Sequence, residues 1–381
     1  MSQAQSFWRQ FPRRSTILFL LGVFLIFSTI AFVVDMTEMG RESTLRFVLS
    51  VLITGAFPVL YAFAGFSLRN KWWKACVPIF VVHLALLNVL ATRLPTPPRP
   101  DHMDAAQVAQ LDSRLGFDGV ASILAVFLGY FCFVYVSITE SRRYLRVRAE
   151  IDLAMEIHRV LVPPIDTQVG GYEFYGRSVP SGDVGGDLID LARSEEHWVA
   201  YLADVSGHGV APGVVMGMVK SAARMLLSSG DDTGHLLARL NEVIFPLKKP
   251  DMFVTFCFVA RNGDGLRIGL AGHPAILHYS ARSNEVTQLD GPNMPLGILP
   301  SGNFESSEIR TEPGDVFALY TDGFLEQANA AGEEFGLARF QEEFQKHAKE
   351  SLEAICRALQ ESVALHGTQF DDQSILLIRR L

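Results

Sequence analysis

The sequence predicts two dissimilar parts, a bundle of membrane-spanning helices followed by an α+β domain built as a layered sandwich. Apolar residues make up 49% of the 381-residue chain, and the mean hydropathy of +0.21 is high for a wholly water-soluble protein. Residues 1–148 hold 15 basic and 8 acidic residues, whereas residues 149–381 hold 18 basic and 33 acidic ones. The two parts therefore face different solvents.

Four apolar runs in the front part are long enough to cross a bilayer as helices, since about 30 Å of hydrocarbon requires roughly 20 helical residues. None of them contains Asp, Glu, Lys or Arg, and they cover residues 16–34, 47–68, 75–92 and 120–139. Basic residues precede the first run, separate the second from the third and follow the fourth, which places both chain ends in the cytoplasm. Residues 1–139 are thus a predicted membrane domain, in which residues 94–119 form a partly extended loop.

Residues 140–165 are predicted to form a helical linker. Apolar residues recur at helical spacing up to Leu161, no Gly or Pro occurs between residues 140 and 162, and Pro163 and Pro164 end the pattern. This helix could pair with its twin as a coiled coil in a homodimer. The alternative is a helix that packs only on its own domain.

Residues 166–381 read as a domain of short strands with helices grouped between them. Strand-like runs cover residues 172–177, 197–204, 253–261, 266–271, 275–279, 315–320 and 374–379. Helical patterns cover residues 210–228, 235–247, 335–347 and 351–366. Turns at residues 262–265 and 272–274 predict antiparallel hairpins. The acidic balance argues against nucleic-acid binding, and the four cysteines lack the spacing of a zinc site.

Four Asp-bearing turns stand at the ends of these strand-like runs, and they contain Asp187, Asp204, Asp322 and Asp371. Carboxylates that converge at one edge, beside Gly residues that permit close backbone approach, can gather hard cations. Two such ions about 3.5–4 Å apart could activate a water for in-line attack on phosphorus. Each turn alone is weak evidence, because Asp-Gly is a common turn.

The order of these turns resembles the SpoIIE/RsbU branch of the PPM (protein phosphatase 2C-like) serine/threonine phosphatases, from about residue 151 to the end of the sequence. The matching segments are Glu156-Ile157-His158-Arg159-Val160-Leu161-Val162-Pro163, Val184-Gly185-Gly186-Asp187, Asp204-Val205-Ser206-Gly207-His208-Gly209, Ala271-Gly272-His273-Pro274, Pro295-Leu296-Gly297, Thr321-Asp322-Gly323 and Asp371-Asp372-Gln373-Ser374. The resemblance implies an α/β/β/α sandwich, in which two antiparallel sheets are flanked by helices. The front part resembles no family that we can name.

The resemblance also implies a role for each matched residue. Asp204 would bridge two Mn²⁺ or Mg²⁺ ions, with the Val205 carbonyl as a neighbouring ligand, and a third ion is an option. Asp322 and Asp371 would complete one metal site, and Asp187 would act close to the second metal. Asp187 and Asp204 are therefore the predicted catalytic carboxylates, while Asp372 would support the ligand position.

Two further residues have two interpretations each, and a third has one. His208 could donate a proton to the leaving oxygen, or it could be a turn residue before the helix that begins at Val210. Arg177 could hold a phosphate oxygen through its planar guanidinium, or it could be an ordinary strand residue. Asp190 is interpreted as structural.

The resulting hypothesis is a phosphatase anchored in the bacterial inner membrane that removes phosphate from a serine or threonine of a partner protein. By resemblance, that partner is a STAS-type anti-anti-sigma protein. The alternative is a catalytically silent membrane receptor that uses the same fold to bind a signalling partner. A diguanylate cyclase or a sensor kinase would need motifs that the sequence lacks, and a transporter would need more polar spans.

Overall fold

The computed structural model describes residues 12–67, 72–98, 102–193, 197–207, 209–228, 233–263 and 265–381. The chain divides into two compact units, Met1–Val147 and Arg148–Leu381. The division falls inside the segment that the sequence predicts to be a linker.

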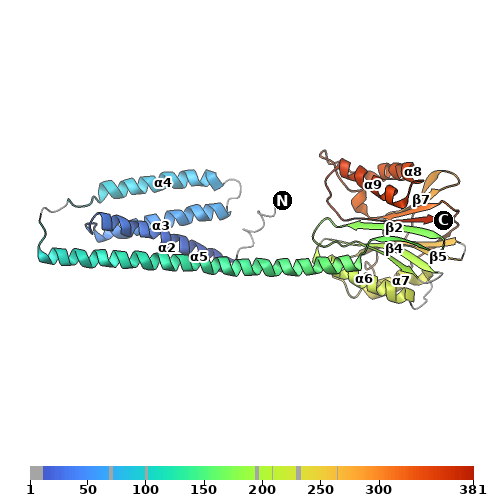
Figure 1. Ribbon diagram of the computed structural model, residues 1–381, viewed down its shortest axis with the longest axis horizontal. Coiled ribbons are helices and arrows are strands. Elements are labelled where there is room, and N and C mark those ends of the chain that lie inside the picture. Colours follow the sequence, from blue (N-terminus) through green and yellow to red (C-terminus); the bar gives the residue numbers. More distant parts are fainter. Residues whose placement is uncertain are drawn as a thin grey trace. The chain divides into compact units, whose positions relative to one another are not determined.

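The front unit consists of long apolar helices (Figure 1). These are α2 (Arg13–Thr37), α3 (Thr44–Ser67), α4 (Trp72–Arg93) and the portion of α5 (Ala105–Leu161) that precedes Arg148. By length and composition, each of the four helices could cross a membrane. Helices α2, α4 and α5 each contain one of the predicted spans, and α3 contains residues 47–67 of the remaining one, whose last residue lies outside the described residues.

Helix α5 begins at Ala105, inside the stretch that the sequence predicts to be partly extended, so that prediction was wrong for residues 105–119. The reason is a reciprocal cap at the start of the helix. The Gln107 backbone N–H donates to Asp104 Oδ1 at 2.7 Å, and the Asp104 backbone N–H donates to Gln107 Oε1 at 3.0 Å. This capping box satisfies amides that would otherwise lack partners at a helix start.

Small residues bring α2 and α5 close together. A Cβ added to Gly22 would lie 3.1 Å from the Gly129 carbonyl oxygen, and the Phe19 and Phe133 ring centroids are 5.1 Å apart. Farther along the same pair of helices, Ser15 Oγ donates to Glu140 Oε1 at 2.5 Å. Backbones that approach this closely gain dispersion contacts along their length, which is how helices associate in lipid.

The rear unit contains two antiparallel sheets. One is six-stranded, in the order β1-β2-β11-β10-β7-β8, and the other is five-stranded, in the order β3-β4-β5-β6-β9. The strands are β1 (Ile165–Val169), β2 (Tyr172–Val179), β3 (Leu188–Arg193), β4 (Trp198–Val205), β5 (Val254–Asn262), β6 (Gly265–Ala271), β7 (Ile276–Ser280), β8 (Glu285–Leu289), β9 (Ser307–Ile309), β10 (Val316–Tyr320) and β11 (Gln373–Arg380). The helices are α6 (Val210–Ser228), η3 (Thr233–His235), α7 (Leu236–Ile244), η4 (Asp322–Phe324), α8 (Gly336–His347) and α9 (Leu352–His366).

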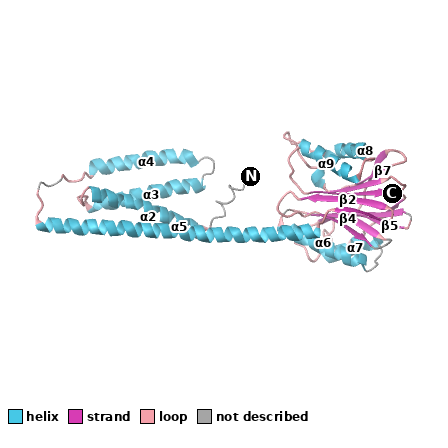
Figure 2. Ribbon diagram, viewed as in Figure 1, coloured by secondary structure: helices cyan, strands magenta, loops and turns pink. Residues whose placement is uncertain are grey.

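The two sheets stack face to face, with α6 and α7 covering one outer face and α8 and α9 covering the other (Figure 2). Strand β10 shows how the layers are joined, because its side chains alternate between two cores. Phe317 and Leu319 belong to the core that also contains residues of the five-stranded sheet, whereas Ala318 and Tyr320 pack with α8 and α9. The predicted α/β/β/α sandwich is confirmed.

By length and composition alone, helix α6 could also cross a membrane. In the structure it packs on β3 and β4, and Val215, Met216 and Val219 are buried there. Its apolar face therefore lies in the core of the sandwich.

The sequence missed β1, β3, β8 and β9, which are three to six residues long. Strand β8 has an exposed or partly buried pattern, and β3 is buried at five successive positions, so neither shows a clear alternation. The turn at residues 262–265 does join a hairpin, β5 to β6. The prediction of a hairpin at residues 272–274 was wrong, because that segment carries the chain from β6 in one sheet to β7 in the other.

Candidate active site

The four predicted Asp residues lie at matching ends of strands in the two sheets. In the five-stranded sheet Leu188 pairs with Ala203, which puts Asp187, just before β3, beside Asp204 near the end of β4. In the six-stranded sheet Tyr320 pairs with Ile375, so Asp322, just after β10, and Asp371, just before β11, share one edge. Antiparallel pairing thus collects residues that are far apart in the sequence.

Thr321 connects the two sheets at this edge. Its buried hydroxyl donates to Asp187 Oδ2 at 2.9 Å and accepts the Ser374 backbone N–H at 2.9 Å. One side chain therefore fixes the Asp187 carboxylate relative to the β10–β11 pair. No role for Thr321 was predicted from the sequence, although it lies directly before Asp322.

Asp372 is a buried support for the loop that carries Asp187. Its Oδ1 accepts from the Ser181 backbone N–H at 2.7 Å and from the Ser181 hydroxyl at 3.0 Å, and its Oδ2 accepts from the Gly186 backbone N–H at 2.7 Å. Three hydrogen bonds occupy both oxygens. This agrees with the expectation that Asp372 supports the site. Among the described residues, the Asp371 carboxylate accepts one hydrogen bond, from the Asp372 backbone N–H at 2.8 Å, and so has more capacity to bind a ligand than Asp372.

Two glycines allow the backbone to close around the site. A Cβ added to Gly186 would lie 2.8 Å from the Val205 carbonyl oxygen, so this carbonyl faces the loop that leads to Asp187. A Cβ added to Gly323 would overlap the backbone carbonyl of Asp372. The Gly residues beside Asp187 and Asp322 are therefore needed for close approach rather than for flexibility.

The carboxylates disfavour one another's charged forms. Burial, followed by the charges of Asp322 and Asp371, raises the pKa of Asp204 to about 7. Burial and the charge of Asp204 raise the pKa of Asp187 well above its ordinary value. Burial and the charge of Asp371 raise the pKa of Asp322. Like charges in a dry setting repel, and a bound cation would reverse this effect.

The donor set fits hard divalent cations. It consists of carboxylate oxygens and the Val205 carbonyl, which are the ligands that Mg²⁺ and Mn²⁺ prefer. Within the described ranges, no three Asp, Glu, His or Cys side chains are already grouped closely enough to hold a metal ion. The carboxylates are thus neighbours that a cation would draw together, rather than a closed cage.

Comparison with known proteins identifies this arrangement. Residues 194–381 match the family model described as stage II sporulation protein E (SpoIIE). Phosphoserine phosphatase RsbU of Bacillus subtilis is 26% identical over 240 residues, which cover 61% of this chain and 71% of RsbU. The rear unit is a SpoIIE/RsbU-like serine/threonine phosphatase domain of the PPM type. Phosphoserine phosphatase RsbP of Bacillus subtilis is 24% identical, but the match covers only 46% of RsbP and 48% of this chain.

A solved structure agrees with the fold of the phosphatase domain. The SiaA-PP2C domain of Pseudomonas aeruginosa superposes with a TM-score of 0.55 at 24% sequence identity. The match covers 98% of that domain and 62% of this chain. The portion of the chain outside the match is about the size of the helical front unit.

One predicted site residue of the phosphatase domain, Arg177, does not join the Asp cluster. The Arg177 guanidinium stacks on the Tyr175 ring, 4.3 Å from its centroid, and donates to the Gly176 carbonyl oxygen at 3.1 Å. The Arg177 charge is close enough to act on the Cys356 thiol of α9. The guanidinium therefore lies on the outer face of the six-stranded sheet, which α8 and α9 cover. His208 lies outside the described residues.

His273 has a structural position. Its Nδ1 lies 2.8 Å from the Thr255 hydroxyl and its Nε2 lies 3.1 Å from the Tyr320 carbonyl oxygen, so a neutral ring that donates through Nε2 satisfies both. Burial lowers the pKa of His273 to about 3. The ring therefore ties β5 to the end of β10, one residue before Thr321.

A second ion cluster holds α6 in place. Asp190 on β3 accepts from Arg224 Nε and Nη2, each at 2.6 Å, and from the Tyr201 hydroxyl at 2.5 Å. Lys220 Nζ lies 3.3 Å from Asp190 and also donates to the Leu161 carbonyl oxygen at the end of α5. Asp190 thus attaches α6 to β3, and Lys220 of α6 extends the cluster to the last residue of α5.

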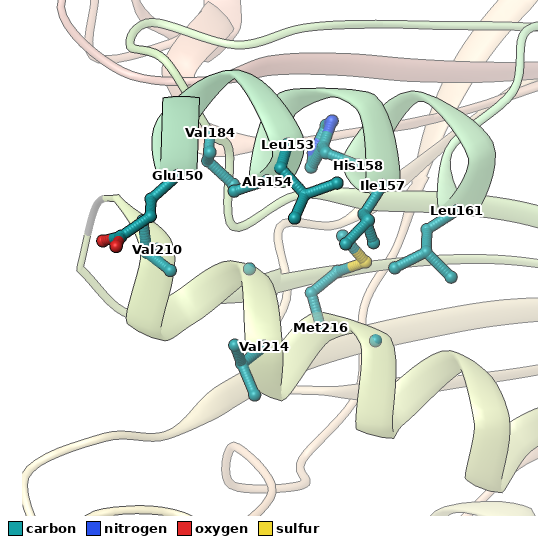
Figure 3. A pocket seen from close by; sticks show the side chains of 12 residues that line it. Glu150, Leu153, Ala154, Ile157, His158, Leu161, Val184, Val210, Val214 and Met216 are labelled. Carbon is teal, nitrogen blue, oxygen red and sulfur yellow. The ribbon is translucent and has the colours of Figure 1, made fainter. Parts of the chain in front are cut away.

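The end of α5 and the start of α6 line an open apolar cavity of about 370 Å³. Leu153, Ile157 and Leu161 point from α5 toward α6, where Val214 and Met216 lie (Figure 3). His158 also borders this cavity. Burial lowers its pKa, and its Nε2 has no hydrogen-bond partner among the described residues. The contact between these helices is therefore incompletely filled.

Proposed function

We propose that this protein hydrolyses phosphoserine or phosphothreonine on a regulatory partner protein, using two divalent cations held by the rear unit. The observation that supports this proposal is the crowding of Asp187, Asp204 and Asp322, which raises the pKa of each. Crowded carboxylates cost stability unless a cation neutralises them, so an arrangement of this kind is typical of a metal centre.

Asp204, Asp322 and Asp371 would hold one ion, and Asp204 with the Val205 carbonyl and Asp187 would hold the other. When bound, Mn²⁺ or Mg²⁺ would polarise the phosphoryl oxygens and lower the pKa of a water. The chain itself fixes the geometry, because Thr321 orients Asp187 and Asp372 holds the Gly186 amide. His208 stays a candidate proton donor to the leaving oxygen.

The substrate class follows from the relatives. RsbU and RsbP are named as phosphoserine phosphatases, and the resemblance to their family suggests a phosphorylated STAS-type anti-anti-sigma protein as the partner. The rear unit would provide acidic metal ligands, and its sequence contains no GxxxxGK(S/T) phosphate cradle. A phosphorylated protein side chain is therefore a better fit than a nucleotide.

The front unit would anchor the enzyme in the bacterial inner membrane, with both termini and the phosphatase domain in the cytoplasm. Supporting this, α2 to α5 are each long and apolar enough to span a bilayer, and basic residues occupy alternate loops. The linker helix would pair with a second copy through side chains outside the cavity lining, such as Val160, which is 75% exposed. Such pairing would be one way to control how α5 contacts α6.

The test uses the fragment 148–381, which forms one compact unit. We expect it to hydrolyse p-nitrophenyl phosphate and a phosphoserine peptide with added Mn²⁺, and to lose this activity with a chelator. Asp183→Asn is the matched control, because Asp183 is exposed and pairs only with Arg148, at 3.6 Å, among the described contacts. A fragment that is folded, binds the partner and shows no metal-dependent turnover would instead be the silent receptor.

A further inference from the structure

A second group of buried acidic residues lies in the front unit, at the end of the bundle where α2 turns into α3. Asp35 in the last turn of α2 is fully buried, Glu42 in the connecting turn is 2% exposed, and Asp118 on α5 is 1% exposed. Charged groups are rarely buried this completely without full compensation. None of these residues belongs to the phosphatase site.

Two arginines compensate part of this charge. Arg114 Nε donates to Asp35 Oδ2 at 2.7 Å and Arg114 Nη2 donates to Asp35 Oδ1 at 2.9 Å, which is a bidentate pair. Arg46 Nε donates to Glu42 Oε1 at 2.8 Å, and Arg46 Nη1 donates to the Leu94 carbonyl oxygen at 2.6 Å. Each guanidinium is thus committed to one carboxylate.

Asp118 has no such partner. It follows Arg114 by one helical turn on α5 and lies within hydrogen-bonding reach of the Asp35 carboxylate. Its Oδ2 is buried and has no hydrogen-bond partner among the described residues. Two carboxylates in contact cannot both stay ionised at low cost away from water.

The surrounding charges do not resolve this imbalance. Nearby, Glu38 and Arg41 pair with each other at 2.8 Å, and Arg41 Nη1 also donates to the Pro97 carbonyl oxygen at 2.6 Å. Within the described residues, three buried carboxylates therefore face two half-buried guanidinium groups, so the cluster lacks one positive charge.

We propose that Asp35 and Asp118 form a proton-binding site, in which a protonated Asp118 donates a hydrogen bond to the ionised Asp35. One proton balances the charge, and it converts the unpartnered Oδ2 from a carboxylate oxygen into a neutral carbonyl oxygen, which costs less to bury. A proton fits better than a metal ion, because guanidinium groups already bind both oxygens of Asp35 and one oxygen of Glu42.

Loss of this proton would weaken the contact between α2 and α5. Two negative charges would then meet beside Arg114, and the turn at Gly40 is packed too tightly to absorb a shift, since a Cβ added there would lie 3.1 Å from Arg114 Cδ. The site would thus link the protonation of this end of the bundle to the packing of the helix that continues toward residue 147. That link makes it a sensor of pH on its side of the membrane.

The test compares the full-length protein in lipid nanodiscs with two variants. Asp118→Asn mimics the protonated carboxyl, because its amide can donate to Asp35. Asp112→Asn is the matched control, since Asp112 lies on the same helix and is exposed. We expect infrared difference spectra between about pH 5 and about pH 8 to contain the stretch of a buried protonated carboxylic acid in the wild type and in Asp112→Asn. The band is lost in Asp118→Asn.

Thermal unfolding provides the second measurement. We expect the midpoint of the wild type and of Asp112→Asn to fall as pH rises, relative to Asp118→Asn, because the folded site holds a proton that the unfolded chain releases. Even if Asp118→Asn does not fold, the wild-type spectrum shows whether a buried protonated carboxylic acid is present. A spectrum with no buried acid band, a band that persists in Asp118→Asn, or a midpoint that responds to added Na⁺, Mg²⁺ or Ca²⁺ instead of pH would each overturn the proposal. None of these outcomes bears on the phosphatase activity of the rear unit.

Discussion

Asp190 and Asp204 lie on neighbouring strands of one sheet, and both are largely buried, yet their surroundings shift their pKa values in opposite directions. Burial acts to raise the pKa of Asp190, but hydrogen bonds from Arg224 and Tyr201 outweigh it and lower that pKa. Burial raises the pKa of Asp204 to about 7, and the nearby carboxylates add to the effect. The difference separates an acid that the chain neutralises itself from one that requires a cation from solution.

The comparison distinguishes structural from functional acids. Asp190 already has its positive partners, so its role is to attach α6 to the sheet. Asp204 has acidic neighbours instead, and the fold maintains this repulsion through Thr321 and Asp372, which hold adjacent segments in place. A repulsive cluster that the surrounding structure stabilises is expected at a site where a ligand completes the charge balance.

The largest effect is expected from Asp204→Asn in the fragment 148–381, which tests whether Asp204 is an acid that requires a cation. We expect turnover of p-nitrophenyl phosphate to fall by about 1,000-fold or more, because the residue predicted to contact both ions is lost. The thermal midpoint without metal should stay equal or rise, since a repulsive charge is removed. Asp183→Asn, at an exposed position nearby, should change neither quantity. Turnover within about tenfold of the wild type would refute the role assigned to Asp204.

The metal-free fragment should also become less stable as pH rises. Asp204 has a folded-state pKa of about 7 against an ordinary value of 3.8, so its neutral form favours the folded state. That stability is complete below about pH 4 and is lost as pH approaches 7, by an amount on the order of 4 kcal/mol at most. Thermal melts across this range, with and without Mn²⁺, measure it. Saturating Mn²⁺ should remove the decline, and a decline unchanged by Mn²⁺ would argue against a metal centre.

Local patterns in the sequence were sufficient for the elements with long periodic signals. Helix α6 was predicted with its observed bounds, residues 210–228, and α9 within one residue at its start. The family motifs also identified the four Asp turns that the two sheets bring to one edge. In each case the information lies within about twenty neighbouring residues, where periodicity and turn chemistry are readable.

Contacts between distant segments could not be predicted in this way. Thr321 contacts Asp187 across 134 positions, and Arg114 pairs with Asp35 across 79. The sequence around a threonine or an arginine does not indicate such a distant partner, because the strand order and the helix packing determine which residues meet. The capping box at Asp104 was readable, since its Asp-x-x-Gln spacing is local, and it was missed because the preceding prolines suggested an extended loop.

A smaller effect is expected from Gly323→Ala, which tests whether the repulsive cluster is held by close backbone packing. The new Cβ would overlap the Asp372 carbonyl, so the turn that carries Asp322 would have to move away from the one that carries Asp371. We expect a loss of about 2–3 kcal/mol of unfolding free energy and weaker Mn²⁺ binding by calorimetry. The matched control is Gly182→Ala, where nothing lies within 4 Å of the added Cβ. Equal behaviour of the two variants would show that the turn is not constrained.

The smallest effect is expected from Asp190→Asn, which changes the acid that the chain neutralises itself. The amide cannot balance Lys220 and Arg224, but Arg224 is 45% exposed and water can solvate it. We therefore expect only about 2 kcal/mol of destabilisation, less than for a fully buried pair, with Mn²⁺ affinity unchanged because the residue is not part of the metal cluster. Urea unfolding measures the first quantity and calorimetry measures the second. If Asp190→Asn weakened Mn²⁺ binding as much as Gly323→Ala does, α6 would have to be counted as part of the metal centre, and the division between a structural and a functional acid would fail.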